Sequence, residues 1–245
     1  MEKKNKKIFN GVKPKILLGL TTTRGSDWRE KIKEIDKFKI KEIALFLTCV
    51  DVKKRKGIYK LLEKTGLLEI PFVHLRDDFE EWEFEYLIKK FKTKAFNTHF
   101  DRLDEKFLKN SSKYKKFIYL ENNWNFCDEM LKWFKIFPGF CLDASHFENY
   151  CVIQKSPDQK NLPKHLKKYK IGCAHFSAVK KKPFLEIDES VERNIYVSHL
   201  MKDLSDFDYV KKYKNFLPKF CGIELENSFK EQLEAKKYLE KILFG

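Results

Sequence analysis

The sequence lacks any long hydrophobic run and any segment that resembles a secretion signal. No apolar stretch approaches the roughly 18 residues that a membrane-spanning helix needs. The lysine-rich start, MEKKNKK, leads into no apolar signal-peptide core. We therefore expect a cytoplasmic protein with no membrane partner.

Cysteine is present, but its spacing is not that of a disulfide framework or a small zinc domain. The chain has six cysteines and no Cys-x-x-Cys pair. Small disulfide-rich and zinc-binding domains place their cysteines in such closely spaced patterns. We therefore expect reduced thiols, with Cys141, Cys173 and Cys221 serving as small apolar residues within strands.

The sequence also has no acidic surplus. It contains 36 aspartates and glutamates and 51 lysines and arginines, which gives a formal net charge of +15. Such an excess attracts polyanions, including nucleic acids and phosphorylated metabolites. Most of the excess is lysine scattered along predicted helices, which is equally typical of a solvated surface. The charge therefore indicates a class of partner without selecting one.

What the sequence does have is a sustained alternation of short apolar runs and amphipathic stretches, which is typical of a parallel α/β fold. A length of 245 residues, 42% of them hydrophobic, suits one barrel with a substantial core. We predict a single (β/α)8 TIM barrel over residues 1–245. Its eight predicted strands cover residues 16–21, 43–48, 70–75, 95–100, 117–122, 140–144, 171–176 and 221–226.

The segments between these runs predict helices and two long loops. Helical patterns cover residues 27–38, 80–91, 126–135 and 228–243, and Ser228 with Glu231 forms a capping box at the start of the last one. Residues 147–169 and 177–217 are longer than a plain crossover. We expect them to be loops on the carboxyl face of the barrel, where substrate recognition is usually built.

Six predicted strands end in side chains that can bind a divalent metal. The carboxyl ends of barrel strands converge on one face, where enzymes of this fold keep their chemistry. Histidines and carboxylates that converge there are suitable ligands for Zn²⁺ or Mn²⁺. The sequence therefore predicts a metalloenzyme. The candidate ligands are His74, His99, Glu121, Asp143, His146, His175, Glu224 and Glu226.

The period of a β-strand indicates which of these side chains share a face. In FCLDASH the side chains of Cys141 and Asp143 point the same way, and His175 occupies the equivalent position in IGCAHF. In GIELEN both Glu224 and Glu226 point to that face, so either could reach a metal. We expect Glu226, which is nearer the predicted strand end, to be the ligand.

These motifs resemble those of the xylose isomerase-like TIM barrels, a superfamily that includes endonuclease IV-type AP endonucleases and sugar isomerases or epimerases. The sharpest is GFCLDASHFE, in which an apolar strand ends in Asp and a His follows three residues later. IYLEN resembles a strand of that family ending in Glu-Asn, and GIELEN resembles its final strand. The resemblance implies a metal tetrad of Glu121, Asp143, His175 and Glu226.

The other histidines make the resemblance closest to the endonuclease IV branch. That branch has a His at the ends of the third and fourth strands, where His74 and His99 stand. The resemblance implies that these two residues and Glu121 hold one metal, and that Glu121 bridges to a second metal held by the tetrad. A third metal would rest on His146 and His199, although the Asp that this branch places two residues before the latter is absent.

The first predicted function is the metal-dependent hydrolysis of a phosphodiester, as at an abasic site in DNA. More than one metal ion can generate hydroxide and stabilise both the attacking and the leaving oxygen. Basic residues after the predicted strand ends could hold a phosphate backbone. They are Arg24, Arg76, Arg102 and Lys180, with Lys181 and Lys182 next to it.

The alternative function is the isomerisation or epimerisation of a small sugar or sugar phosphate. One metal would then chelate the substrate, and Glu121 or Glu226 would be the catalytic carboxylate that moves the proton α to the carbonyl. His74 and His99 would contact the substrate instead of a metal. A barrel that only binds a metabolite or a partner is a third possibility, for which loss of the metal tetrad would be the signature.

Overall fold

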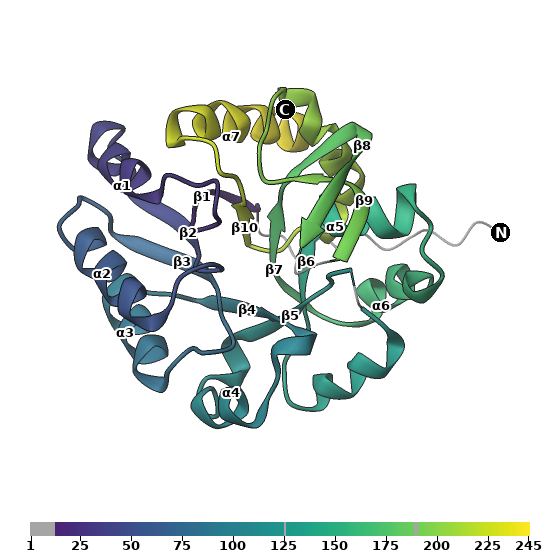
Figure 1. The fold of residues 1–245 in the computed structure, drawn as a ribbon, viewed down its shortest axis with the longest axis horizontal. Coiled ribbons are helices and arrows are strands. Elements are labelled where there is room, and N and C mark those ends of the chain that lie inside the picture. Colours follow the sequence, from purple (N-terminus) through teal and green to yellow (C-terminus); the bar gives the residue numbers. More distant parts are fainter. Residues whose placement is uncertain (1–12, 125, 189–190) are drawn as a thin grey trace.

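Eight short apolar segments of the chain form the strands of a closed, fully parallel barrel (Figure 1). The computed structural model describes residues 13–124, 126–188 and 191–245. The last barrel strand pairs with both the first and the seventh and so closes the sheet. The predicted (β/α)8 TIM barrel is confirmed. Its strands are β1 (Lys15–Thr21), β2 (Glu42–Phe46), β3 (Glu69–His74), β4 (Ala95–His99), β5 (Ile118–Glu121), β6 (Phe140–Asp143), β7 (Ile171–Phe176) and β10 (Phe220–Ile223).

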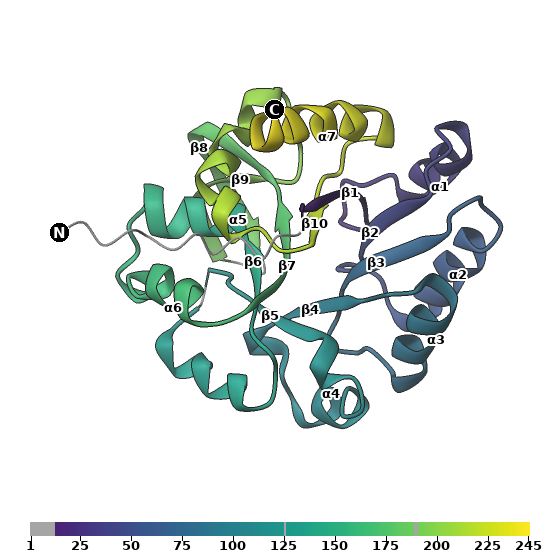
Figure 2. The same cartoon turned by 180° about the vertical axis from the view of Figure 1, so that it is seen from behind.

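Helices surround the barrel and alternate with its strands (Figures 1 and 2). The predicted helices at 27–38, 80–91 and 228–243 are confirmed, and so is the capping box of Ser228 and Glu231. Within the described ranges, no helix is long and apolar enough to cross a membrane. The α-helices are α1 (Trp28–Lys37), α2 (Val52–Leu62), α3 (Glu81–Phe91), α4 (Glu105–Asn110), α5 (Ala144–His146), α6 (Leu162–Lys168) and α7 (Phe229–Phe244).

Several connections between strands contain 3₁₀ or π-helix. The segment predicted as a helix at 126–135 is a 3₁₀ helix, η3 (Asp128–Lys135). The long segment after β6 contains a π-helix, η4 (Phe147–Ile153), followed by a short 3₁₀ turn, η5 (Pro157–Gln159). A further 3₁₀ helix, η6 (Leu204–Phe216), precedes β10, and shorter 3₁₀ turns, η1 (Phe100–Arg102) and η2 (Lys115–Phe117), flank α4.

The segment expected to be a long loop at 177–217 instead begins with an antiparallel hairpin. Its strands are β8 (Ala178–Asp188) and β9 (Val191–Ser198). Their register breaks between Val179 and Phe184, next to Pro183, which has no N–H to donate to a strand ladder. The hairpin lies close to η4 and η6. It adds a wall to the carboxyl side of the barrel that the sequence pattern did not predict.

Apolar side chains fill the barrel interior and form a plug. Alternate strand residues point inward, and the inward set is separate from the larger core between the sheet and the helices. The cysteines at 141, 173 and 221 are buried free thiols, as expected. The plug consists of Leu17, Ala44, Phe46, Phe72, Ala95, Tyr119, Cys141 and Cys173.

A buried ion pair fixes the loop between β3 and α3. The guanidinium of Arg55 is fully buried and donates two hydrogen bonds of 2.8 Å to the carboxylate of Glu83. It also donates to Asp78 at 2.8 Å, and Asp78 accepts a hydrogen bond from Arg76 at 3.1 Å. Because this loop directly follows His74, the ion pair anchors one side of the face where the barrel strands end.

We predict that Glu83→Ala lowers the free energy of unfolding by about 3–5 kcal/mol, because it leaves the Arg55 guanidinium buried without its main partner. Urea denaturation followed by circular dichroism measures this change. The matched control is Glu85→Ala on the same helix, whose exposed pair with Lys89 should contribute almost nothing. Equal stability of the two variants would contradict the anchoring role of Arg55.

Candidate metal centre

Six strand ends bring imidazoles and carboxylates to the carboxyl mouth of the barrel. The strand period places each of these groups two residues after an inward position of the same strand. In β6 and β7, for example, Cys141 and Cys173 belong to the plug, and Asp143 and His175 follow them as direct partners in the sheet register. His99 and Glu121 are partners in the same way across β4 and β5.

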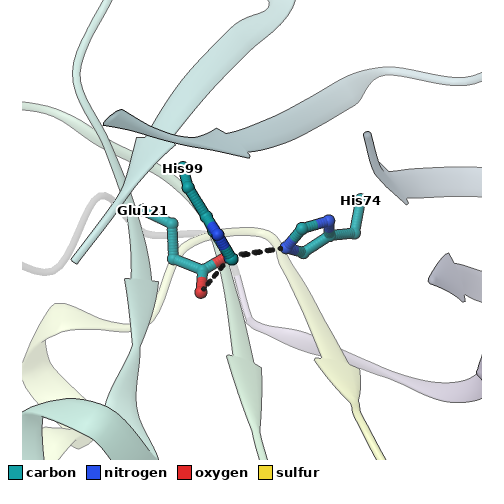
Figure 3. Close-up of side chains that lie close together, drawn as sticks. All are labelled: His74, His99 and Glu121. Carbon is teal, nitrogen blue, oxygen red and sulfur yellow. Dashed lines mark hydrogen bonds and ion pairs between the residues drawn. The ribbon is translucent and has the colours of Figure 1, made fainter. Parts of the chain in front are cut away.

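The carboxylate of Glu121 is the centre of this group. Its Oε2 atom lies 3.1 Å from Nε2 of His74 and 3.0 Å from Nε2 of His175, and its Oε1 atom lies 3.3 Å from Nε2 of His99. Figure 3 shows how His74 and His99 both point their rings at this carboxylate. Glu121 is only 2% exposed. One nearly buried carboxylate therefore faces three imidazoles.

A second set of donors adjoins the first. Nδ1 of His175 lies 3.0 Å from Oε2 of Glu224 and 3.7 Å from Oδ2 of Asp143. His74, His99 and Glu121 form one group whose ligand atoms lie within 4.8 Å of one another, and Asp143, His175 and Glu224 form another. The two sets share no residue, and the contact between His175 and Glu121 joins them.

His146 extends the cluster toward the solvent. It follows Asp143 by three residues, and its Nδ1 atom lies 3.5 Å from Oδ2 of that residue. Glu121, Asp143 and His146 make a further group with ligand atoms within 4.8 Å. The backbone N–H of His146 donates to Oδ1 of Asp143 at 2.8 Å, which makes Asp143 the N-cap of α5. The spacing in GFCLDASHFE thus places both side chains together.

The histidine tautomers and unpaired ring nitrogens suit a metal. Nδ1 of His74 lies 3.0 Å from the carbonyl oxygen of Leu75, and donation there leaves the Nε2 lone pair facing Glu121 and His99. Metal-ligating histidines typically donate their other ring N–H in this way. Both ring nitrogens of His175 and Nδ1 of His146 are buried and face carboxylate oxygens at 3.0–3.7 Å, but in the described part of the chain none of these contacts has hydrogen-bond geometry. Buried polar atoms are usually hydrogen-bonded, so this arrangement suits a cation shared between the nitrogens and the carboxylates.

The charges of the cluster shift the pKa values of its members. Burial disfavours the charged form of Glu121, but His175, His99 and His74 outweigh that effect and hold its pKa well below the ordinary value. Burial likewise raises the pKa of Glu224, but the attraction of His199 and His175 outweighs burial and lowers this pKa to about 2. Burial also opposes ionisation of His175, yet three carboxylates raise its pKa well above 6.5. The carboxylates are therefore ready to bind a cation, while His175 must lose a proton to do so.

Two predicted ligands lie at the edge of this cluster, outside the donor groups. Glu226 is half-buried, and its Oε1 atom accepts a hydrogen bond from the backbone N–H of Gly25 at 3.2 Å. The geometry favours Glu224 over the expected Glu226, because β10 ends at Ile223 and, of the two, Glu224 belongs to a donor group of the described residues. Nδ1 of His199 lies 3.3 Å from the carbonyl oxygen of Glu224, so it supports that segment instead of joining a donor group.

A cavity of about 780 Å³ opens above the cluster. The hairpin β8–β9 forms part of its wall, including Phe184 and Arg193. Three of the predicted basic residues, Arg24, Arg76 and Arg102, line it, whereas Lys180 lies outside the lining and pairs with Asp206 at 2.6 Å. Lys181 and Lys182 are exposed and also lie outside the lining.

Several residues of this site were not predicted from the sequence. Nδ2 of Asn97 donates to Oε2 of Glu121 at 2.5 Å, and the Asn122 side chain exchanges two hydrogen bonds with the backbone of Asp143, at 2.9 and 3.0 Å. Asn97 lies two residues before His99 on the inward face, so the strand period could have identified it. Arg193 has its guanidinium 4.8 Å from the ring centre of Trp124 at the cavity wall, and no motif indicated that pair.

Comparison with known proteins adds little to this geometry. No family model matches the chain, and no curated protein matches it in sequence. A solved structure of an uncharacterized protein from Parabacteroides distasonis is similar in shape, with a TM-score of 0.48 and 13% sequence identity. The match covers 92% of this chain and 98% of that one. The function must therefore be argued from the site itself.

Proposed function

We propose that this chain is a divalent-metal-dependent hydrolase that cleaves phosphodiesters, with DNA that carries an abasic site as its substrate. The observation that supports the proposal is the position of Glu121, whose carboxylate belongs to one set of candidate metal ligands and contacts His175 of the second set at 3.0 Å. A carboxylate that joins two donor sets suits a site with more than one ion. Sites of that kind are common in enzymes that hydrolyse phosphate esters.

Each set has the donor chemistry for Zn²⁺ or Mn²⁺. His74, His99 and Glu121 would hold one ion, and Asp143, His175 and Glu224 would hold the other. When bound, such ions supply a hydroxide at neutral pH and neutralise charge on the phosphate oxygens. The third ion that the sequence resemblance implies would rest on His146 and His199; of these two, His146 lies beside Asp143, whereas His199 lies outside the donor groups of the described residues.

The other residues of the cavity support binding of a phosphodiester. The arginines at 24, 76 and 102 line the cavity around the cluster, where their guanidinium groups can bind phosphate oxygens. Glu226 also lines the cavity but lies outside the two donor sets. Its carboxylate is therefore the proposed catalytic base that orients a water molecule and accepts its proton, while Glu121 is committed to the ligand cluster.

One observation favours the alternative, a metal-dependent isomerase or epimerase of a small sugar or sugar phosphate. The cavity of about 780 Å³ has the size of a pocket for a small molecule, and the β8–β9 hairpin encloses one side of it. In that case Asp143, His175 and Glu224 would hold a single ion, and His74 and His99 would contact the substrate. Metal content distinguishes the two functions.

We predict that the purified protein retains two or more metal ions per chain and that His99→Ala lowers the count by one. The variant should lose cleavage of abasic-site DNA by more than about 100-fold, because even the loss of a group that only orients a metal ligand costs about 10–100-fold. Elemental analysis measures the metal count, and cleavage of a labelled oligonucleotide measures activity. The matched control is His165→Ala, which removes a histidine that instead contacts Asp128.

One metal per chain in the unchanged protein, together with intact abasic-site DNA at low salt, would contradict the hydrolase. The isomerase predicts a different result for the same variant. His99→Ala would then raise the KM for a small sugar and leave the metal content unchanged. Asp143→Ala should remove metal under either function, since it deletes a ligand of the set that both functions share.

Metal affinity should rise with pH, because protons compete with the metal for His175. Its pKa is raised well above 6.5 by the carboxylates that outweigh its burial, so metal binding must displace a proton over the physiological range. The stability of the metal-free protein should change with pH in the opposite direction. Protonated His175 contributes its full stabilisation below pH 6.5, and this contribution is lost as the pH rises through the raised pKa of His175. Competition with a chelator between about pH 6 and 8 tests this, and an affinity that does not change with pH would contradict it.

A further inference from the structure

A second cavity lies at the opposite end of the barrel from the metal centre. Its volume is about 400 Å³, and it is lined by residues at the starts of β4, β7 and β10, near the ends of α6 and η6. Because all barrel strands are parallel, their starts form the amino-terminal mouth, and the apolar plug separates this cavity from Glu121. Nothing in the proposed hydrolase or isomerase uses it.

Five lysines surround this cavity, and none of its lining residues is acidic: they are Lys94, Lys167, Lys170, Lys214 and Lys219. In the described ranges, no carboxylate lies within ion-pair distance of any of the five. By contrast, Lys15 at the start of β1 pairs with Glu42. All five side chains are exposed, and Glu69, whose ion-pair partner is Lys92, is a carboxylate that Lys94 acts on from a longer distance. The local excess of positive charge favours binding of an anion with several charges.

Three of the five lysines have their backbone held by the barrel itself. Lys94, Lys170 and Lys219 directly precede β4, β7 and β10. The backbone N–H of Lys94 donates to the carbonyl of Pro71, and the carbonyls of Lys170 and Lys219 accept from the N–H groups of neighbouring strands, all at 2.8–3.0 Å. The barrel therefore fixes where these three side chains start, and binding a ligand has to order only their side-chain rotamers.

The floor of the cavity is aromatic. Tyr119, the plug residue of β5, lies between small residues of the neighbouring lining, Ala95 and Gly172. A Cβ atom at Gly172 would lie 2.0 Å from the Tyr119 ring, so only glycine allows the ring to lie against β7. The ammonium group of Lys170 lies 5.5 Å from the centre of that ring. Tyr119 is therefore buried between these neighbours, and the half-buried Phe216 and Phe220 of the lining are the aromatic side chains that can contact a flat apolar part of a ligand.

We propose that this amino-terminal pocket binds a small anion with several phosphate charges and a planar ring, the chemistry of a nucleoside polyphosphate. The lysines hold the phosphate chain, and Phe216 with Phe220 holds the ring. A volume of about 400 Å³ suits a ligand of that size. This pocket shares no lining residue with the cavity of the candidate metal centre, so this proposal does not depend on the proposed hydrolase.

Titration of the full chain with a fluorescent ATP analogue tests the proposal. We expect saturable binding that ATP displaces and that is weakened at least about tenfold by Lys170→Glu combined with Lys219→Glu, since both changes replace a charge-assisted contact by a repulsion. The control is Lys230→Glu combined with Lys237→Glu on α7, which changes the net charge equally with exposed lysines outside this lining. It should leave the affinity within about twofold, as expected if local contacts outweigh net charge.

Two further measurements distinguish this pocket from the metal centre and from a surface that binds any polyphosphate. Phe216→Ala should weaken the binding of ATP more than the binding of inorganic triphosphate, because only ATP has a ring that can contact Phe216. Arg24→Glu, at the metal-centre cavity, should leave binding unchanged. The proposal is overturned if the unchanged protein shows no saturable binding, if the α7 control weakens binding as much as the pocket variant, or if Arg24→Glu abolishes it. Tighter binding of a single-stranded oligonucleotide that depends on the same lysines would also overturn it, in favour of a nucleic-acid surface.

Discussion

The burial of one carboxylate, Glu121, among three imidazoles is the interaction on which the carboxyl face depends. Removing a carboxylate from water costs several kcal/mol unless charges or hydrogen bonds replace the lost hydration. Here His99 and His175 supply positive charge, Asn97 donates a hydrogen bond, and the His74 ring also faces the carboxylate. These four partners come from three different strands, so the arrangement exists only when the barrel is closed. The polar cluster and the fold therefore depend on each other.

The plug beneath the cluster determines how strongly these charges interact. Phe46 and Phe72 lie with their ring centres 5.7 and 6.3 Å from that of His175 and separate it from the opposite end of the barrel. Apolar surroundings weaken the screening of charge by water, which is why the pKa values of Glu121 and His175 move far in opposite directions. Two residues of the same plug, Ala95 and Tyr119, line the cavity at the amino-terminal mouth. The plug thus adjoins both the candidate metal centre and the proposed amino-terminal pocket.

The sequence predicted the barrel and most of its cluster because both follow from strand period. An apolar run that ends in His, Asp or Glu identifies a strand and its carboxyl end at once, as FCLDASH and IGCAHF do for Asp143 and His175. The same period could not separate Glu224 from Glu226, because it does not state where a strand stops. The β8–β9 hairpin was missed since it sits in a long segment with a proline, and its pairing depends on contacts that are distant in sequence. The amino-terminal pocket was not predicted, because its lysines come from separate segments of the chain and look like ordinary surface charge in the sequence.

The most direct test of the bridging role of Glu121 is to locate metal by anomalous diffraction from crystals grown with Zn²⁺ or Mn²⁺. We expect one anomalous peak within ligand distance, about 2.0–2.2 Å, of both Glu121 and a nitrogen of His74 or His99. A second peak should lie at ligand distance from Asp143, His175 and Glu224. Crystals soaked in a saturating metal solution that show no peak within ligand distance of Glu121 would contradict that role, since its carboxylate would then be held by the imidazoles alone.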